Sequence, residues 1–220
     1  MGSTDLSHFV PALRAMGNII STNDPSIVER CLWLGLLDKL NSLLYQSNSN
    51  IIKECLWTFS NITAGPTHHV EKFLESDTFE RVLMLCDSRN IDIRKEAIFV
   101  IAHSIDSADV QMRGHLYQKT GGTLLKVMID AANMNDMRLR LSVLDAIEDL
   151  LKLDDWLGWG RSEQSLKLVF EKLGGLDALE ELTKTPNVQV YNKATEILAK
   201  YFDAADQMDL GGGNQPWQVR

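Results

Sequence analysis

Cysteine, proline and excess positive charge are all scarce in this sequence. Its three cysteines, Cys31, Cys55 and Cys86, are far apart and lie within apolar helical patterns. We therefore expect buried, reduced thiols rather than disulfides or metal ligands, as in proteins of the cytosol or nucleus. The net charge of −8 argues against a nucleic-acid-binding protein, which would carry an excess of basic residues. It favours basic partners instead.

Long apolar runs and alternating patterns are absent as well. No run approaches the roughly 20 apolar residues needed to cross a bilayer, so no membrane partner is expected. No stretch alternates long enough to indicate a strand. Only five prolines interrupt the 220 residues, and the segments between them repeat apolar residues with helical spacing.

The chain repeats itself with a period of about 42 residues. Asn18, Asn61 and His103 occupy matching positions and are spaced by 43 and 42 residues. The matching segments are 12–22, 55–65 and 97–107, with more degenerate copies at 143–153 and 192–202. A second amphipathic helix precedes each later copy and ends in a polar turn. Such a period indicates armadillo or HEAT repeats. We predict an all-α fold, an armadillo-repeat right-handed superhelical solenoid with a concave groove.

The period divides the chain into three parts. Residues 1–10 are predicted to form an N-terminal extension, 11–202 about 4.5 armadillo repeats with the first one incomplete, and 203–220 a disordered, Gly-rich tail. Because the repeats start at a last helix, we expect either a fragment of a longer array or a partner at that end. In the tail, Trp217 is either a short binding motif or an incidental aromatic residue.

A polar and aromatic stripe recurs on the last helix of each repeat. Residues three and seven positions after a starting residue share its helical face. Repeat by repeat, these sets are Pro11/Arg14/Asn18, Glu54/Trp57/Asn61, Glu96/Phe99/His103, Ser142/Asp145/Asp149 and Gln189/Asn192/Glu196. The opposite faces carry Leu, Ile, Val and Phe and should form the core. The stripe is therefore predicted to lie along the groove.

The stripe suits an extended basic peptide. An asparagine amide both donates and accepts hydrogen bonds, so Asn61 can hold a peptide backbone. The indole of Trp57 can pack against the stem and cation of a lysine or arginine, with Glu54 and Glu96 placed to receive the charge. The alternative is that Trp57 belongs to the core and Asn61 bonds to a loop carbonyl.

Three segments resemble consecutive repeats from the C-terminal half of importin-α, the nuclear-import adaptor: "PALRAMGNII", "KECLWTFSNITAG" and "KEAIFVIAHS". Residues 174–202 resemble its last repeat, so that the resemblance covers 11–202. It implies an armadillo solenoid whose groove binds basic nuclear localisation signals.

The resemblance also implies roles for individual residues. In the family this half of the solenoid carries the minor signal-binding site. Trp57 and Asn61 match a Trp/Asn pair on the groove face of one last helix, and we call such a pair a rung. Glu54 and Glu96 match acids that contact the signal. Asn18 matches a groove asparagine, and Arg14 an arginine between the two signal sites. Importin-β, a recycling exportin and nucleoporins are further implied partners, and the implied location is shuttling between cytoplasm and nucleus.

The sequence departs from the family at the next rung, where Phe99 and His103 replace Trp and Asn. Phenylalanine binds cations less strongly than tryptophan, and a protonated imidazole would repel a basic peptide. Ser21-Thr22 also replaces a Thr-Gly turn. We therefore expect weak binding of a basic peptide. The alternative is an armadillo scaffold that holds a constitutive protein partner. Its groove residues would differ too much from those of the family to bind such signals.

Motifs for other chemistry are missing. No nucleophile elbow, Walker loop, zinc spacing or dinucleotide fingerprint occurs, so we expect no enzymatic activity, cofactor or metal. Gly121-Gly122 and Gly174-Gly175 are interpreted as turn glycines. His68-His69 are interpreted as solvated loop histidines rather than metal ligands.

Two clusters near the C-terminal repeats are harder to interpret. Asp145, Glu148 and Asp149 are expected to be acids on successive solvated turns that extend the negative field of the groove, rather than a catalytic pair. Residues 154–159, with Asp154, Asp155, Trp156 and Trp159, form a longer loop than in the other repeats, which serves either as a contact site or in packing.

Overall fold

The computed structural model describes residues 6–22, 24–159 and 162–202. The predicted tail with Trp217 lies outside these residues, as do residues 1–5 of the predicted N-terminal extension. The described residues form α-helices and contain no strand. None of their helices combines the length and apolar character needed to cross a membrane.

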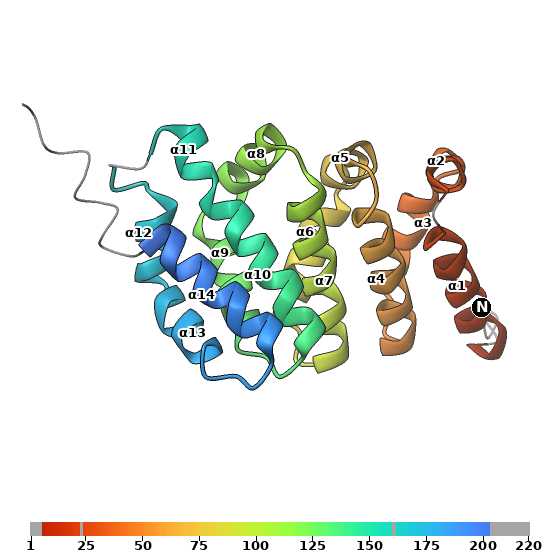
Figure 1. Cartoon of the computed structure of the whole chain (residues 1–220). Coiled ribbons are helices and arrows are strands. Elements are labelled where there is room, and N and C mark those ends of the chain that lie inside the picture. The colour runs from red at the N-terminus through yellow and green to blue at the C-terminus, as the bar shows by residue number, and fades with distance from the viewer. Residues whose placement is uncertain (1–5, 23, 160–161, 203–220) are drawn as a thin grey trace, which may run out of the picture.

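The helices follow one another in a three-helix repeat (Figure 1). In chain order they are α1 (Leu6–Ile20), α2 (Pro25–Trp33), α3 (Leu36–Leu43), α4 (Ser49–Thr63), α5 (Thr67–Glu75), α6 (Thr78–Leu85), α7 (Ile91–Ser107), α8 (Val110–Thr120), α9 (Gly122–Ala132), α10 (Met137–Leu151), α11 (Leu153–Leu157), α12 (Leu166–Lys172), α13 (Gly175–Leu182) and α14 (Val188–Phe202). The boundary expected at residue 11 falls inside α1, which already begins at Leu6.

Helices with the same place in the repeat lie in rows. The third helices α1, α4, α7, α10 and α14 each contact the next one and run side by side across Figure 1. The first helices α2, α5 and α8 lie along the upper edge of that view. The predicted all-α armadillo solenoid is thus confirmed, with the short α11 as an addition between α10 and α12.

Polar caps and glycines set where the helices begin. Asn48, Asn90 and Asp136 accept backbone hydrogen bonds at the starts of α4, α7 and α10, which satisfies N–H groups that the first turn leaves free. Gly121 and Gly174 have φ of 56° and 82° directly before α9 and α13. The interpretation as turn glycines is confirmed for these two, since such φ values are strained for other residues, whereas Gly122 and Gly175 are the first residues of the helices.

One continuous core runs through the repeats and across the contacts between them. On α4, Phe59 and Ile62 are fully buried, and the Thr63 hydroxyl donates to the Val100 carbonyl of α7 at 3.3 Å. Cys55 and Cys86 are free, buried thiols as predicted, and burial raises the pKa of each to about 12. Cys31 is free but only half-buried.

Residues 154–159 do not form the predicted loop: most of them belong to the short helix α11, and the segment serves mainly in packing. The fully buried Asp154 carboxylate accepts hydrogen bonds from the Ser165 hydroxyl at 2.7 Å and from the backbone N–H groups of Leu166 and Lys167, and so fixes the start of α12. Trp159 packs edge-on against Tyr117, with ring centroids 6.2 Å apart. Of the two interpretations of this segment, packing therefore accounts for Asp154 and Trp159.

The interpretation of His68 and His69 as solvated loop residues is wrong: neither lies in a loop, and only His68 is solvated. Both lie on α5, and the His69 side chain is completely buried while His68 is exposed. Neither ring nitrogen of His69 has a hydrogen-bond partner among the described residues. Burial lowers the pKa of His69, with His68 and Lys72 adding to the shift and Glu29 opposing it.

This buried imidazole should make stability depend on pH. Below about pH 6.5 the unfolded chain takes up a proton at His69 that the folded chain resists, so the free energy of unfolding should fall as the pH drops. His69→Leu should weaken this decline and cost little at pH about 7.5, because it removes an unbonded buried polar group. Denaturant unfolding at several pH values measures both effects. His68→Gln, an exposed change next door, is the matched control, and an equal decline in wild type and His69→Leu would contradict the assignment.

Candidate peptide-binding groove

The predicted rung residues meet at a cavity on the row of third helices. Arg14 and Asn18 of α1, Lys53, Glu54 and Trp57 of α4, and Glu96 of α7 line a cavity of about 310 Å³. Asn61 lines a neighbouring cavity of about 350 Å³ near the turn between α1 and α2. Six of the eight predicted site residues therefore lie at two adjoining hollows. Phe99 and His103 line neither of them.

Trp57 rests on a glycine of the preceding third helix. A Cβ atom added to Gly17 would lie 2.3 Å from Cζ3 of the indole and 2.6 Å from Cε3. Only glycine allows the ring to pack this closely against α1. The residue is half-buried, so that one edge of the indole packs on α1 while part of the side chain remains accessible from the cavity.

Asn61 and His103 make the same contact one repeat apart. The Asn61 amide donates to the Gly17 carbonyl at 3.3 Å, and His103 Nδ1 lies 3.1 Å from the Ser60 carbonyl. Because a carbonyl only accepts, Nδ1 of His103 carries the hydrogen. Asn61 thus does bond to a backbone carbonyl, as the alternative interpretation expected, but the carbonyl belongs to a helix rather than a loop. This bond uses one of the two hydrogens of the Asn61 amide group.

Glu54 already has a cationic partner within the chain. Its carboxylate accepts from Nε of Arg14 at 3.2 Å and from a second guanidinium nitrogen, a bidentate ion pair between α4 and α1. Glu54 is buried and Arg14 is exposed. The hydrogen bond to Glu54 raises the pKa of Arg14. We predicted Glu54 as a receptor for a peptide cation, and the structure instead pairs it with Arg14.

Glu96 is the groove carboxylate without an ion pair among the described residues. It is half-buried on α7. Burial raises its pKa, and Glu54 and Asp92 raise it further, while Lys53 and Arg138 oppose the shift. An additional cation in the groove would stabilise its ionised form most directly.

The acids of the later repeats do not extend a negative field, contrary to expectation. Glu148 and Asp149 are buried rather than solvated. The ion pairs are Lys193 to Asp145 and Glu148, Lys200 to Glu148, Lys152 to Asp149 and Arg113 to Asp149, with N–O distances of 2.7–2.8 Å. Burial favours the neutral form of Glu148, but hydrogen bonds from Lys193 and Lys200 outweigh it and lower the pKa to about 2.

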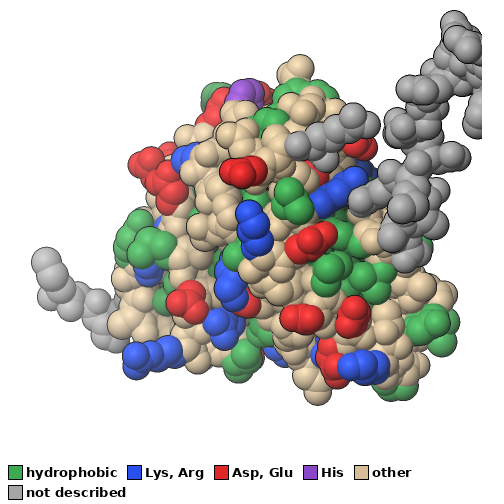
Figure 2. Space-filling model, turned by 90° about the vertical axis from the view of Figure 1, so that its left-hand side faces the viewer, with side chains coloured by type: hydrophobic (Ala, Val, Ile, Leu, Met, Phe, Trp, Pro, Cys, Tyr) green, Lys and Arg blue, Asp and Glu red, His purple; other side chains and the backbone are tan. Residues whose placement is uncertain are grey.

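The surface at this end reflects the pairing. Figure 2 looks at the C-terminal end of the array and shows acidic and basic side chains interspersed where grey atoms leave it visible. The lysines responsible, Lys193 and Lys200, lie on α14, one repeat away from the acids on α10. Beyond Glu96, the acids on α10 are therefore paired with cations of the chain and do not provide the negative surface predicted for the groove.

Two groove residues were missed by reasoning from the sequence. Gly17 provides both the space for Trp57 and the carbonyl for Asn61, and Lys53 adds a cation to the cavity that the two glutamates line. Each directly precedes a predicted residue, Asn18 and Glu54. The only sign in the sequence of the close contact between Trp57 and Gly17 is that a small residue occupies the position on the preceding helix that faces the indole.

Comparisons with known proteins agree with this architecture. A family model described as "Atypical Arm repeat" matches residues 164–213. Importin subunit alpha-4 of Arabidopsis thaliana is 30% identical over 219 residues, which cover 97% of this chain and 40% of the relative. Importin subunit alpha-2 of Oryza sativa subsp. japonica is 26% identical over 212 residues, covering 91% and 39%. The chain thus spans about two fifths of the length of these curated relatives.

Solved structures bear on the fold alone. A designed armadillo repeat protein, YIII(Dq)4CqI, matches with a TM-score of 0.60 and 20% identity, covering 90% of this chain and 95% of the other. A related design in complex with peptide (KR)4 matches with a TM-score of 0.60 and 22% identity over the same shares. These matches agree with the armadillo fold, and the family model together with the curated relatives identifies the chain as an importin-α-like armadillo protein.

Proposed function

We propose that this chain binds basic nuclear localisation signals in its groove, as the minor-site half of a nuclear-import adaptor. The observation that carries the proposal is the cavity lined by both the half-buried Trp57 and Glu96, whose carboxylate makes no ion pair with another residue that the structure describes. An aromatic face next to a free acid is a site for the stem and cation of one lysine or arginine.

The row of third helices supports an extended ligand. Packed helices lie about 8–10 Å apart, and an extended chain advances about 3.3 Å per residue, so that one rung serves roughly three peptide residues. The Asn61 oxygen has lone pairs left for a peptide N–H after its amide has bonded to Gly17. Backbone contact of this kind holds a peptide regardless of its side chains.

The Arg14–Glu54 pair sets a limit on affinity. A peptide cation can reach Glu96 directly, but it can use Glu54 only by displacing Arg14 from a bidentate pair. Lys53 at the same cavity adds a second positive charge that opposes a basic ligand. We therefore propose weak binding by this chain alone.

The comparisons support the same class of ligand. The curated relatives are importin alpha subunits, and an armadillo design of the same fold was solved with the basic peptide (KR)4. Because the chain covers about two fifths of the relatives, cargo proteins, importin-β, a recycling exportin, nucleoporins and shuttling between cytoplasm and nucleus are all parts of this proposal.

A second candidate is a scaffold that holds a constitutive protein partner. It is favoured by the rungs after Trp57, where Phe99 and His103 replace the family's residues and the acids around Glu148 are neutralised by lysines of the chain itself. A scaffold would bind a partner through other surfaces and would not distinguish a basic peptide from its neutral counterpart.

The first prediction concerns the Trp57 rung. Calorimetry with a bipartite signal peptide should give an affinity about tenfold lower for Trp57→Ala and for Asn61→Ala, because each loses a contact of about 1 kcal/mol or more. Trp33→Ala removes an exposed tryptophan from α2 and should bind like wild type. Unchanged binding in both variants would show that Trp57 and Asn61 do not contact the peptide. Equal binding of a peptide whose lysines are replaced would favour the scaffold function.

The second prediction is a gain of affinity. Phe99→Trp with His103→Asn should strengthen binding of the same peptide several-fold, since an indole is the better cation platform and an asparagine has no positive form. Asparagine should keep the bond to the Ser60 carbonyl, as Asn61 does with Gly17. His115→Asn on the exposed face of α8 is the control. No gain in the double variant would mean that this rung does not reach the peptide.

The third prediction is a pH dependence carried by Glu96. Its raised pKa means that it takes up a proton at a higher pH than an ordinary carboxyl group, and only its ionised form attracts a cation. Affinity should therefore be highest near neutral pH and fall as the pH is lowered towards about 5. In a His103→Asn background, which removes the nearby imidazole, Glu96→Gln should bind more weakly at neutral pH and lose most of the pH dependence. An equally steep profile in the Glu96→Gln variant would assign the effect elsewhere.

A further inference from the structure

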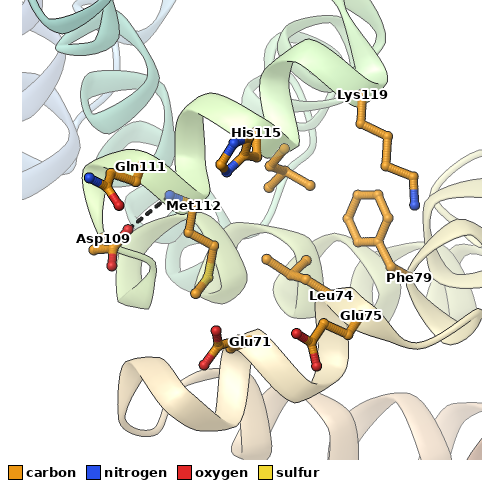
Figure 3. Close-up of a pocket in the computed structure, with 10 residues that line it drawn as sticks. Glu71, Leu74, Glu75, Phe79, Asp109, Gln111, Met112, His115 and Lys119 are labelled. Atoms are coloured by element: carbon orange, nitrogen blue, oxygen red, sulfur yellow. Dashed lines mark hydrogen bonds between the residues drawn. The ribbon is translucent and has the colours of Figure 1, made fainter.

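A third cavity lies on the edge formed by the first helices. Its volume is about 350 Å³, and it is lined by residues of α5, the start of α6, and α8 with its N-cap (Figure 3). None of its lining residues lines the groove around Trp57. In Figure 1, α5 and α8 lie along the upper edge, beside the row of third helices. A ligand here would not compete for the Trp57 rung.

The floor of the cavity is apolar. Leu74 of α5, Phe79 of α6, and Met112 and Leu116 of α8 line it, and Phe79 and Leu116 are themselves buried. Met112 is half-buried and extends toward α5 in Figure 3. A methionine side chain adapts readily to different partners. The volume suits one or two large side chains of a ligand, not a folded domain.

The rim is acidic. Glu71 and Glu75 are exposed one turn apart on α5, and neither makes an ion pair with another described residue. The Asp109 carboxylate on the opposite wall caps α8 by accepting from the Met112 N–H at 2.8 Å. Lys119 is the one lining lysine or arginine, and Glu80 neutralises it at 2.7 Å. The cavity therefore joins an apolar floor to a negative rim.

We propose that this cavity docks a short segment of a partner protein in which a large aliphatic or aromatic side chain lies next to a lysine or arginine. The apolar side chain occupies the floor between Leu74 and Met112, where its burial provides the main favourable term. The neighbouring cation lies near Glu71 and Glu75, which pair with it and disfavour acidic segments. The site is separate from the groove, so both can be occupied at once.

The test uses fluorescein-labelled peptides on the full chain. One series carries Leu, Ile, Met or Phe between Lys and Arg residues. A second series has Ala at the central position with the same charges, and a third keeps the apolar residue between glutamates. Fluorescence anisotropy measures affinity, and amide chemical shifts locate the site. All titrations are repeated in Trp57→Ala, so that groove binding by basic peptides is separated from binding at this cavity.

Three variants of the cavity provide the controls. Met112→Trp fills it without changing charge, and Glu71→Lys with Glu75→Lys reverses the rim. Asp177→Lys with Glu180→Lys makes the same change in net charge on exposed positions of α13. Thermal unfolding checks that every variant is folded, and a variant that unfolds is replaced by Leu74→Gln or Glu71→Gln at the same cavity.

We expect at least one basic–apolar peptide to bind about tenfold more tightly than its alanine counterpart, with shifts on α5 and α8. That affinity should survive Trp57→Ala and the α13 change but fall about tenfold in Met112→Trp and in the rim reversal. Binding that is lost in Trp57→Ala, equal binding of the alanine or glutamate series, or no binding below about 1 mM would each overturn this proposal. The proposed function of the groove does not depend on the outcome.

Discussion

The packing of each third helix against the third helices on both sides is the constraint from which the groove follows. A repeat of this size cannot bury an apolar face alone, so α4 packs against α1 and α7 as well as α3. Within residues 51–63 of α4, the only side chains that are not buried are Lys53, Trp57 and Asn61, at intervals of four residues. Neighbours on both flanks reduce the accessible surface of this stretch to a single stripe. Any ligand that α4 binds in its central turns must use that stripe.

The polar residues of the stripe also belong to the framework. Asn61 and His103 each bond to a carbonyl of the preceding third helix, although the Gly17 carbonyl already accepts from the Ser21 N–H within its own chain segment. A carbonyl has two lone pairs and can accept both bonds. The exchange of asparagine for histidine at 103 therefore keeps the donor that joins neighbouring helices. What changes is the group left for a peptide, because an imidazole can become positively charged.

Local signals in the sequence were enough for the fold, but contacts between repeats were not visible in it. Apolar periodicity and the spacing of Asn18, Asn61 and His103 predicted the solenoid and which residues share a face, because each repeat is built from short-range patterns. The pairing of Arg14 with Glu54 joins residues 40 positions apart, and its geometry depends on how far one helix is displaced along the next. His69 was misplaced because Gly65-Pro66 suggests a loop, whereas a proline also fits the start of a helix, and α5 begins directly after it.

The distribution of charge indicates that the long-range attraction of a ligand and its selection in the groove have different origins. A net charge of −8 draws basic molecules from a distance, and salt screens that attraction over about 10 Å. Within the stripe, however, Glu54, Asp145 and Asp149 already hold cations of the chain itself, so most of the acidity predicted for the groove is neutralised internally. Glu96 and, on the last helix, Glu196 are left as its acids without an ion pair among the described residues. Selection at the groove must then come mainly from the shape and polar bonds of Trp57 and Asn61, which salt affects far less than it affects the long-range attraction.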